Sequence, residues 1–158
     1  MSEQVPPFAV PPGSGRTLPT PTGDTIVIKA GTQATHGSMT VAELLVHPGS
    51  GPALHAHVRE DELWWVLDGD FRFKAGERLL RASTGGMAFG PRGTPHCFQN
   101  VGDTPGRLLI VTAPSGLERF FEQSATLPTP IDFDQLATIG HAHGLEFVGP
   151  PLAVSDPL

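Results

Sequence analysis

Two histidines separated by a single residue constrain this chain more than any other feature. If the segment holding His55 and His57 is a β-strand, both side chains lie on one face, because side chains alternate across a strand with a period of two. Both imidazoles can then reach one point. Glu62 follows after a short polar break, and a later turn-rich stretch brings His96. We therefore expect His55, His57, Glu62 and His96 to bind one divalent transition metal.

Both stretches carry a family resemblance. Residues 49–69 match the pattern G-x5-H-x-H-x4-E-x6-G at every fixed position, and residues 85–100 match G-x5-P-x-G-x2-H-x3-N in the same way. The chain resembles the cupin superfamily over these two motifs. The resemblance implies an all-β fold, a double-stranded β-helix or jelly-roll barrel, and it implies the same four metal ligands.

The choice of the acidic ligand has a formal alternative. The family pattern tolerates three or four residues between the second histidine and the acid, so Asp61 competes with Glu62. Strand parity favours Glu62, because it places Trp64 on the same inward face. We expect Glu60 and Asp61 to face solvent.

Composition supports a small all-β domain and limits its partners. The 158 residues suffice for one domain with a real core, and 19 Gly and 17 Pro favour short strands joined by turns. A formal charge of -6 argues against a nucleic-acid surface and against binding to anionic lipid. Cys97 is the single cysteine, so no internal disulfide can form. Without a signal peptide or an apolar run of membrane length, we expect a cytoplasmic protein.

We expect three segments in this domain. Residues 1–22 are rich in proline and should form an extended arm with little helix or ladder pairing, either a disordered tail or an arm over the barrel or a partner. Residues 23–114 should form the barrel. Residues 115–158 should form a C-terminal extension with one or two α-helices, packed on the same domain.

Within the extension, residues 115–118 have the spacing of a capping box, and the helix that follows carries an apolar stripe of Leu117, Phe120 and Phe121. A second helix should begin near Asp132 and stop at Gly144.

Within the barrel, the alternation of residues 71–74 predicts a strand with Phe71 and Phe73 inward and with Arg72 and Lys74 in water.

The remaining histidines and the cysteine are expected to be structural. His36 and His47 lie in or beside loops, where a lone histidine is usually solvated. His141 and His143 fall in a predicted helix, where residues two apart point in different directions and make a poor chelating pair. Period two places Cys97 on the face opposite His96, so we expect a small packed hydrophobe there.

Three imidazoles and a carboxylate suit Fe, Ni, Co, Mn, Cu or Zn, and the ligands alone do not choose among them. Trp64, Phe73 and Phe98 are candidates for an aromatic pocket that binds a planar apolar substrate. Glu62 is the candidate catalytic residue, because a carboxylate beside a Lewis-acidic metal can accept a proton from a substrate hydroxyl.

Among cupins, the acid spacing, the single small domain and the C-terminal run from Gly116 to Pro151 resemble bacterial quercetinase-type dioxygenases. This implies oxygen-dependent cleavage of a flavonol or a related enol or phenol, and acireductone-type dioxygenation stays open. The alternatives are a metal-dependent isomerase or lyase of a small carbonyl or sugar-like substrate, and a non-catalytic small-molecule-binding cupin. The resemblance also implies a homodimer through the outer sheet, with residues 41–46 and the proline arm as candidate interface pieces.

Overall fold

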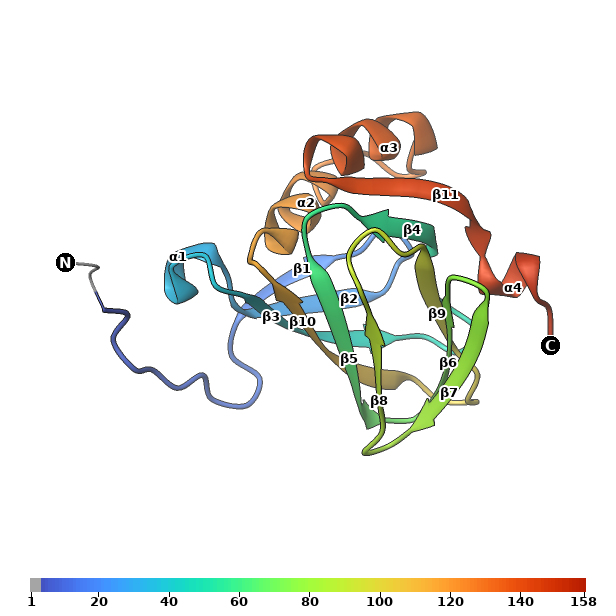
Figure 1. Cartoon of the computed structure of the whole chain (residues 1–158), viewed down its shortest axis with the longest axis horizontal. Helices are drawn as coiled ribbons and strands as arrows, with labels where there is room; N and C mark the ends of the chain where they lie inside the picture. Colours follow the sequence, from blue (N-terminus) through green and yellow to red (C-terminus); the bar gives the residue numbers. More distant parts are fainter. Residues whose placement is uncertain (1–3) are drawn as a thin grey trace.

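The computed structural model describes residues 4–158 and consists of two antiparallel sheets that enclose one core, with helices at the periphery (Figure 1). The six-stranded sheet has the order β1 (Arg16–Pro19), β2 (Thr25–Ala30), β3 (Thr40–Val46), β10 (Gly106–Ala113), β5 (Asp61–Asp68), β8 (Met87–Gly90). The five-stranded sheet has the order β11 (Leu145–Pro151), β4 (Ala53–His57), β9 (His96–Asn100), β6 (Asp70–Ala75), β7 (Arg78–Ser83). The helices are α1 (Thr32–Thr35), α2 (Leu117–Ser124), α3 (Phe133–Ala142), α4 (Leu152–Ser155). The predicted all-β jelly-roll is confirmed.

Alternation along the strands builds the core between the sheets. On β5, Glu62, Trp64 and Val66 are buried, whereas Trp65 between them is exposed on the outer face. The inward faces of both sheets meet in one cluster of buried apolar side chains, which includes Phe71 of β6. Burying side chains of this size stabilises a fold by roughly 1.5–3 kcal/mol each. The same alternation that builds the core also aims Glu62 inward.

The N-terminal arm is not free of ladder pairing, and that expectation was wrong for β1. Leu18 of β1 lies opposite Ile26 in an antiparallel ladder with β2. The edge of β2 would otherwise present unpaired backbone groups, which a short extended segment satisfies. Residues 10–13 line a pocket with β2, β3 and β10, and the described segment before them extends away from the body of the molecule (Figure 1).

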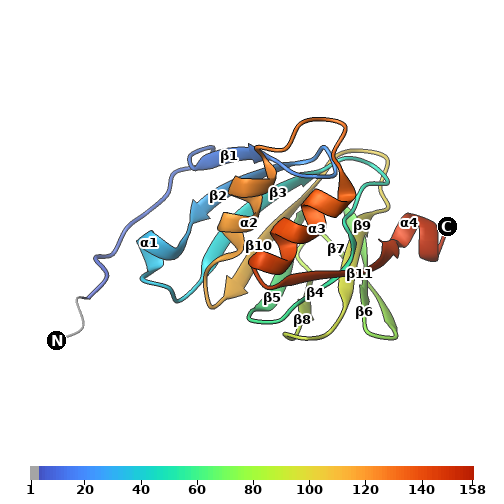
Figure 2. The same cartoon turned by 90° about the horizontal axis from the view of Figure 1, so that it is seen from above.

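The C-terminal extension forms α2 and α3 and the single-turn helix α4; α3 packs on β11, and α2 packs on α3 and β1 (Figures 1 and 2). As predicted, α3 begins after Asp132, whose carboxylate accepts hydrogen bonds from the backbone N–H groups of Asp134 and Gln135. The predicted capping of α2 by Ser115 is wrong, since Gly116 is the N-cap and no side chain caps it. No helix among residues 4–158 is long and apolar enough to span the bilayer.

Glu118, rather than a cap, fixes α2 to the barrel. Its carboxylate accepts hydrogen bonds from the Thr32 hydroxyl at 2.6 Å, the Thr40 hydroxyl at 2.5 Å and the Gly116 N–H at 3.1 Å. Burial alone would raise the pKa of Glu118, but these donors outweigh it and lower that pKa to about 2. One buried carboxylate therefore ties α2 to α1 and β3.

The expectation that Arg72 faces water was wrong. Arg72 is buried, and its Nε donates to Gln99 Oε1 at 2.7 Å while a terminal nitrogen donates to the Leu152 carbonyl at 3.2 Å. The cause is α4, which packs on β9 and covers this outer face of the five-stranded sheet. Strand alternation correctly placed Arg72 opposite the core, but it could not show a second layer there.

Candidate metal centre

The four predicted ligands converge from both sheets. The five-stranded sheet supplies His55 and His57 from β4 and His96 from β9, and His55 lies directly opposite His96 in the ladder. Glu62 faces them from β5 of the six-stranded sheet. All four side chains are at most 7% exposed. The strand alternation that suggested a common face for the histidines therefore holds in the fold.

The donor atoms fit a single metal ion. The donor atoms of the four side chains all lie within 4.8 Å of one another. The Nε2 atoms of His57 and His96 are 3.0 and 2.9 Å from the same oxygen, Oε2 of Glu62. Ligand atoms that bind one zinc-sized ion at about 2.1 Å lie at most about 4.2 Å apart. Small side-chain shifts would therefore bring all four donor atoms within bonding distance of one ion. Borderline nitrogen ligands and one carboxylate suit first-row transition metals.

Hydrogen bonds hold the histidine rings in ligand orientation. The Nδ1 atom of His55 is 2.7 Å from the carbonyl oxygen of Ala53, and that of His96 is 3.0 Å from the carbonyl oxygen of Thr94. A ring that donates its Nδ1 proton to a carbonyl leaves the Nε2 lone pair free for a metal. Both Nε2 atoms are thus prepared as ligands.

The site is electrostatically polarised. Burial and the neighbouring His96 and His57 lower the pKa of His55 to about 3. Burial also lowers the pKa of His57, but Glu62 and Glu60 outweigh it and raise that pKa to about 9. Burial raises the pKa of Glu62, yet His57 and His96 hold it well below its usual range. The carboxylate is therefore ionised and provides the negative charge that a divalent cation requires.

Glu60 and Asp61 were both expected to face solvent, and this holds for Asp61 but not for Glu60. Asp61 lies near the surface and pairs with Arg92, which holds the pKa of Asp61 below its usual range. Glu60, expected to face solvent, is only 4% exposed, so that expectation was wrong. It turns toward His57, with Oε2 at 3.5 Å from Nδ1. Within the polar run after β4, Glu60 turns back toward the site while Val58 and Arg59 stay exposed.

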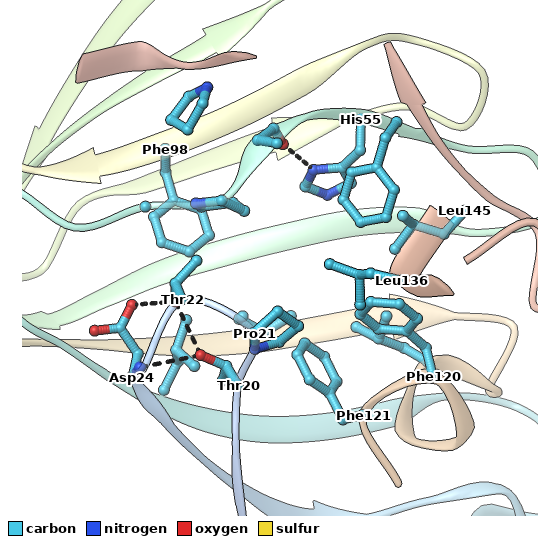
Figure 3. Close-up of a pocket in the computed structure, with 18 of the residues that line it drawn as sticks. Thr20, Pro21, Thr22, Asp24, His55, Phe98, Phe120, Phe121, Leu136 and Leu145 are labelled. Atoms are coloured by element: carbon cyan, nitrogen blue, oxygen red, sulfur yellow. Dashed lines mark hydrogen bonds between the residues drawn. The ribbon is translucent and has the colours of Figure 1, made fainter. Parts of the chain in front are cut away.

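A cavity of about 360 Å³ opens beside the metal ligands. His55, His57 and Glu62 form its polar end, and the β1–β2 turn around Thr22 forms another wall, as Figure 3 shows for the residues it labels. Most of the remaining lining is apolar and comes from β3, β9, β10, β11, α2 and α3. None of the described residues that line it is a lysine or an arginine. The size is that of a small-molecule site.

The three predicted pocket aromatics occupy different places. Phe98 lines the cavity. Trp64 and Phe73 are each 1% exposed and pack on one another in the core, with ring centroids 5.5 Å apart. Trp64 stands edge-on to His96 at 4.9 Å, so it supports a ligand ring from outside the cavity lining.

The aromatic wall of the cavity instead comes largely from the C-terminal extension, through Phe120, Phe121, Phe133 and Phe147. The apolar stripe of α2 was visible in the sequence. Its position over the cavity was not, because it depends on how α2 and β11 pack.

The other histidines lie outside the ligand group. His141 bonds Glu146 through Nδ1 at 2.5 Å, and His143 bonds Gln123 at 2.8 Å, both on the surface. Cys97 is fully buried, and burial raises the pKa of its thiol to about 11. Among residues 4–158, the group of His55, His57, Glu62 and His96 is the one that could hold a metal ion.

Comparisons with known proteins agree with this fold. Residues 42–112 match the family model described as Cupin domain. An uncharacterised protein of Methanocaldococcus jannaschii is 28% identical over 75 residues, which are 48% of this chain and 60% of that protein. The chain thus spans less than two thirds of the curated relative that it matches.

Solved structures extend the likeness at the level of the fold. An RmlC-like cupin from Shewanella frigidimarina superposes with a TM-score of 0.59 at 16% identity, covering 71% of this chain and 96% of the other. A predicted oxalate decarboxylase from Thermotoga maritima gives 0.55 at 25% identity, covering 58% and 80%. KdgF from a Halomonas species gives 0.53 at 21% identity, covering 58% and 79%.

Residues 42–112 are therefore similar to a cupin domain, and the two-sheet barrel agrees with that likeness. The cluster of His55, His57, Glu62 and His96 lies within the matched residues and could bind one metal ion.

Proposed function

We propose that this protein is a metal-dependent cupin enzyme that acts on a small, largely apolar molecule, and that its reaction is the dioxygenation of an enol or phenolic substrate. The observation that carries the proposal is the joining of a buried three-histidine, one-carboxylate cluster to an apolar cavity. Structural zinc sites are closed and usually rich in thiolate, whereas a cluster that opens on a cavity leaves room for substrate.

The cavity favours an uncharged substrate. The described lining holds the acids Asp24 and Glu62 but no lysine or arginine to pair with a substrate anion. Burying an unpaired carboxylate in such surroundings is costly. The aromatic rings of Phe98, Phe120 and Phe147 suit a planar apolar body instead.

Glu62 is the proposed general base. It lines the cavity, it is ionised, and its Oε2 lies among the histidine nitrogens that would hold the metal. When bound, a divalent metal would act as a Lewis acid and lower the pKa of a coordinated hydroxyl. Glu62 Oε2 then accepts the proton of the substrate's enol or phenol hydroxyl, and the apolar walls exclude water from the resulting anion.

A second candidate is an oxygen-independent lyase or isomerase. It is favoured by the likeness, at 25% identity, to the predicted oxalate decarboxylase from Thermotoga maritima. The absence of cationic side chains among the described cavity residues argues against a small dicarboxylate as its substrate.

The test is reconstitution of the metal-free protein with Fe, Ni, Co, Mn, Cu or Zn, followed by oxygen-uptake measurements with flavonols and with simpler enols. We expect oxygen uptake with at least one metal, and loss of that uptake in Glu62→Gln. Turnover of the same compounds under anaerobic conditions would instead establish the lyase or isomerase. Tight binding without turnover by any metal form would make the protein a binding cupin.

We also propose that two copies pair through the outer face of the six-stranded sheet. Apolar side chains that are 43–50% exposed gather there on the neighbouring strands β5 and β8: Trp65, Met87 and Phe89. Leu45 on β3 is 40% exposed on the same sheet but is separated from them by β10. Contiguous exposed apolar residues of this kind are typical of protein interfaces.

A further inference from the structure

Glu60 is a buried carboxylate that the proposed reaction does not use. It is 4% exposed and does not line the cavity beside the metal ligands, but it lines a smaller pocket of about 130 Å³ with Arg59 and Arg119. Its Oε2 atom has no hydrogen-bond partner within the usual limits, and the facing polar atom is Nδ1 of His57 at 3.5 Å. A buried, unpaired carboxylate oxygen is expensive, so its presence beside a metal ligand needs a reason.

No lysine or arginine in the described structure lies within ion-pair distance of Glu60, although Arg59 and Arg119 line the same small pocket and Arg92 interacts with Glu60 by charge from farther away. Among residues 4–158, His57 is the one ion-pair partner of Glu60. Its neighbour Asp61, in contrast, forms an exposed bidentate pair with Arg92, through Nε at 3.2 Å and a terminal nitrogen at 3.1 Å. The two adjacent acids therefore do different things, and Glu60 is directed at the imidazole.

The Nδ1 partners of the three metal-site histidines indicate the role of Glu60. His55 and His96 each have Nδ1 at hydrogen-bond distance from a carbonyl oxygen two residues earlier in the chain. His57 alone has a carboxylate in that place. In all three rings Nδ1 faces an acceptor, and for His57 and His96 Nε2 faces Glu62. His57 follows the same arrangement if the Glu60 carboxylate accepts its Nδ1 proton, as a backbone carbonyl does for His55 and His96.

We infer that Glu60 is a positioning residue for the metal: its carboxylate accepts the Nδ1 proton of His57 and holds the ring with Nε2 directed at the ion. The inference rests on the proposed metal site and assigns a role to a residue outside the ligand set. A charged acceptor also makes the imidazole a stronger donor than a neutral carbonyl would. In the present geometry the two atoms are 3.5 Å apart, so the inferred hydrogen bond requires a small rotation of the His57 ring or of the Glu60 side chain.

The test is the affinity of purified protein for Zn²⁺ and Co²⁺, measured by competition with a chromogenic chelator, in the wild type and in Glu60→Gln. Glutamine keeps the shape and one acceptor oxygen but removes the charge. Loss of an outer partner of a ligating histidine weakens metal binding by about 10- to 100-fold, and we expect an effect of this size. The matched control is Asp61→Asn, which removes one negative charge from the adjacent position and should leave the affinity unchanged.

A second readout does not depend on the variant folding well. In the zinc-loaded wild type, nitrogen NMR of the imidazoles should show His57 protonated at Nδ1 and bound through Nε2. Metal bound at Nδ1 of His57, or an affinity of Glu60→Gln equal to that of the wild type, would overturn the inference. His96→Ala separates the two proposals: if it too bound metal normally, the metal site itself would fail.

Discussion

Gly90 provides the space in which His96 and Trp64 meet. A Cβ atom at this position would lie 2.8 Å from Cη2 of Trp64 and 3.0 Å from Nδ1 of His96, closer than side chains approach. Neither ring can move freely, because Trp64 is packed in the core and His96 is fully buried. The lack of a side chain at Gly90 on β8 therefore allows the His96 ring to occupy its position.

Gly90→Ala should therefore destabilise the protein by about 1–3 kcal/mol, the usual cost of overpacking a core, and should weaken metal binding as well. Urea unfolding and a metal titration measure the two effects. Gly149→Ala is a suitable control, since its Cβ would meet only the side chain of Leu54, at 3.2 Å. Equal unfolding midpoints for both variants would show that the space at Gly90 is not needed.

At the residue scale, the sequence revealed the residues whose positions follow from strand alternation together with the two motifs. His55, His57, Glu62 and His96 belong to this group. Glu60 and Arg72 do not, because their burial comes from contacts made after the strands assemble: Glu60 bends back to His57, and α4 covers Arg72. Nothing in a local pattern separates such residues from ordinary surface charges.

At the scale of elements, the attachment of α2 to the barrel depends on one ionised side chain. The oxygens of Glu118 accept hydrogen bonds from α1, from β3 and from the backbone at the start of α2. Since α2 contributes Leu117, Phe120 and Phe121 to the cavity wall, Glu118 stabilises the binding site indirectly.

This arrangement makes stability depend on pH. The pKa of Glu118 is lowered to about 2 in the folded protein, below the ordinary glutamate value. Its contribution to stability is therefore fully present above about pH 5 and is lost as the pH falls toward about 2. Urea unfolding across this range should show a fall in the free energy of unfolding that is smaller in Glu118→Gln.

Glu118→Gln should also be less stable at neutral pH, because its amide group would face the donors of Thr32 or Thr40. Glu122→Gln is the control, since Glu122 pairs with Arg16 at the surface. A Glu118→Gln variant whose stability falls with acid as steeply as the wild type's would contradict this role.

Elements were predictable to different degrees. The strands of both motifs and the helix that begins after Asp132 follow from local patterns. The pairing of β1 and the packing of the helices over the cavity depend on contacts between distant segments. The cavity wall was therefore the part of the site that the sequence could not show.

At the scale of the whole molecule, the outer face of the six-stranded sheet is the place where a second copy is expected. Trp65 on β5 lies opposite Met87 on β8 and opposite Leu109 on β10, so apolar side chains continue across three strands. When this face packs against the same face of a second copy, these apolar side chains are removed from water, which favours a dimer.

Trp65→Glu should convert the proposed dimer to a monomer with little loss of stability, because Trp65 is 43% exposed in the single chain. Size-exclusion chromatography with light scattering measures the mass. Leu79→Glu, on β7 of the other sheet and 56% exposed, is the matched control and should remain dimeric. A wild-type protein that is already monomeric at working concentration would remove the dimer proposal.

The central claim is that four side chains, distant along the chain, bind one divalent metal, and metal stoichiometry tests it most directly. Metal-free protein titrated with Co²⁺ or Zn²⁺ should take up one ion per chain, and His96→Ala should lose this tight site because its ring is a ligand. His47→Ala, which removes an exposed histidine outside the cluster, should bind as the wild type does. Equal, tight, one-to-one uptake by His96→Ala and the wild type would contradict the account.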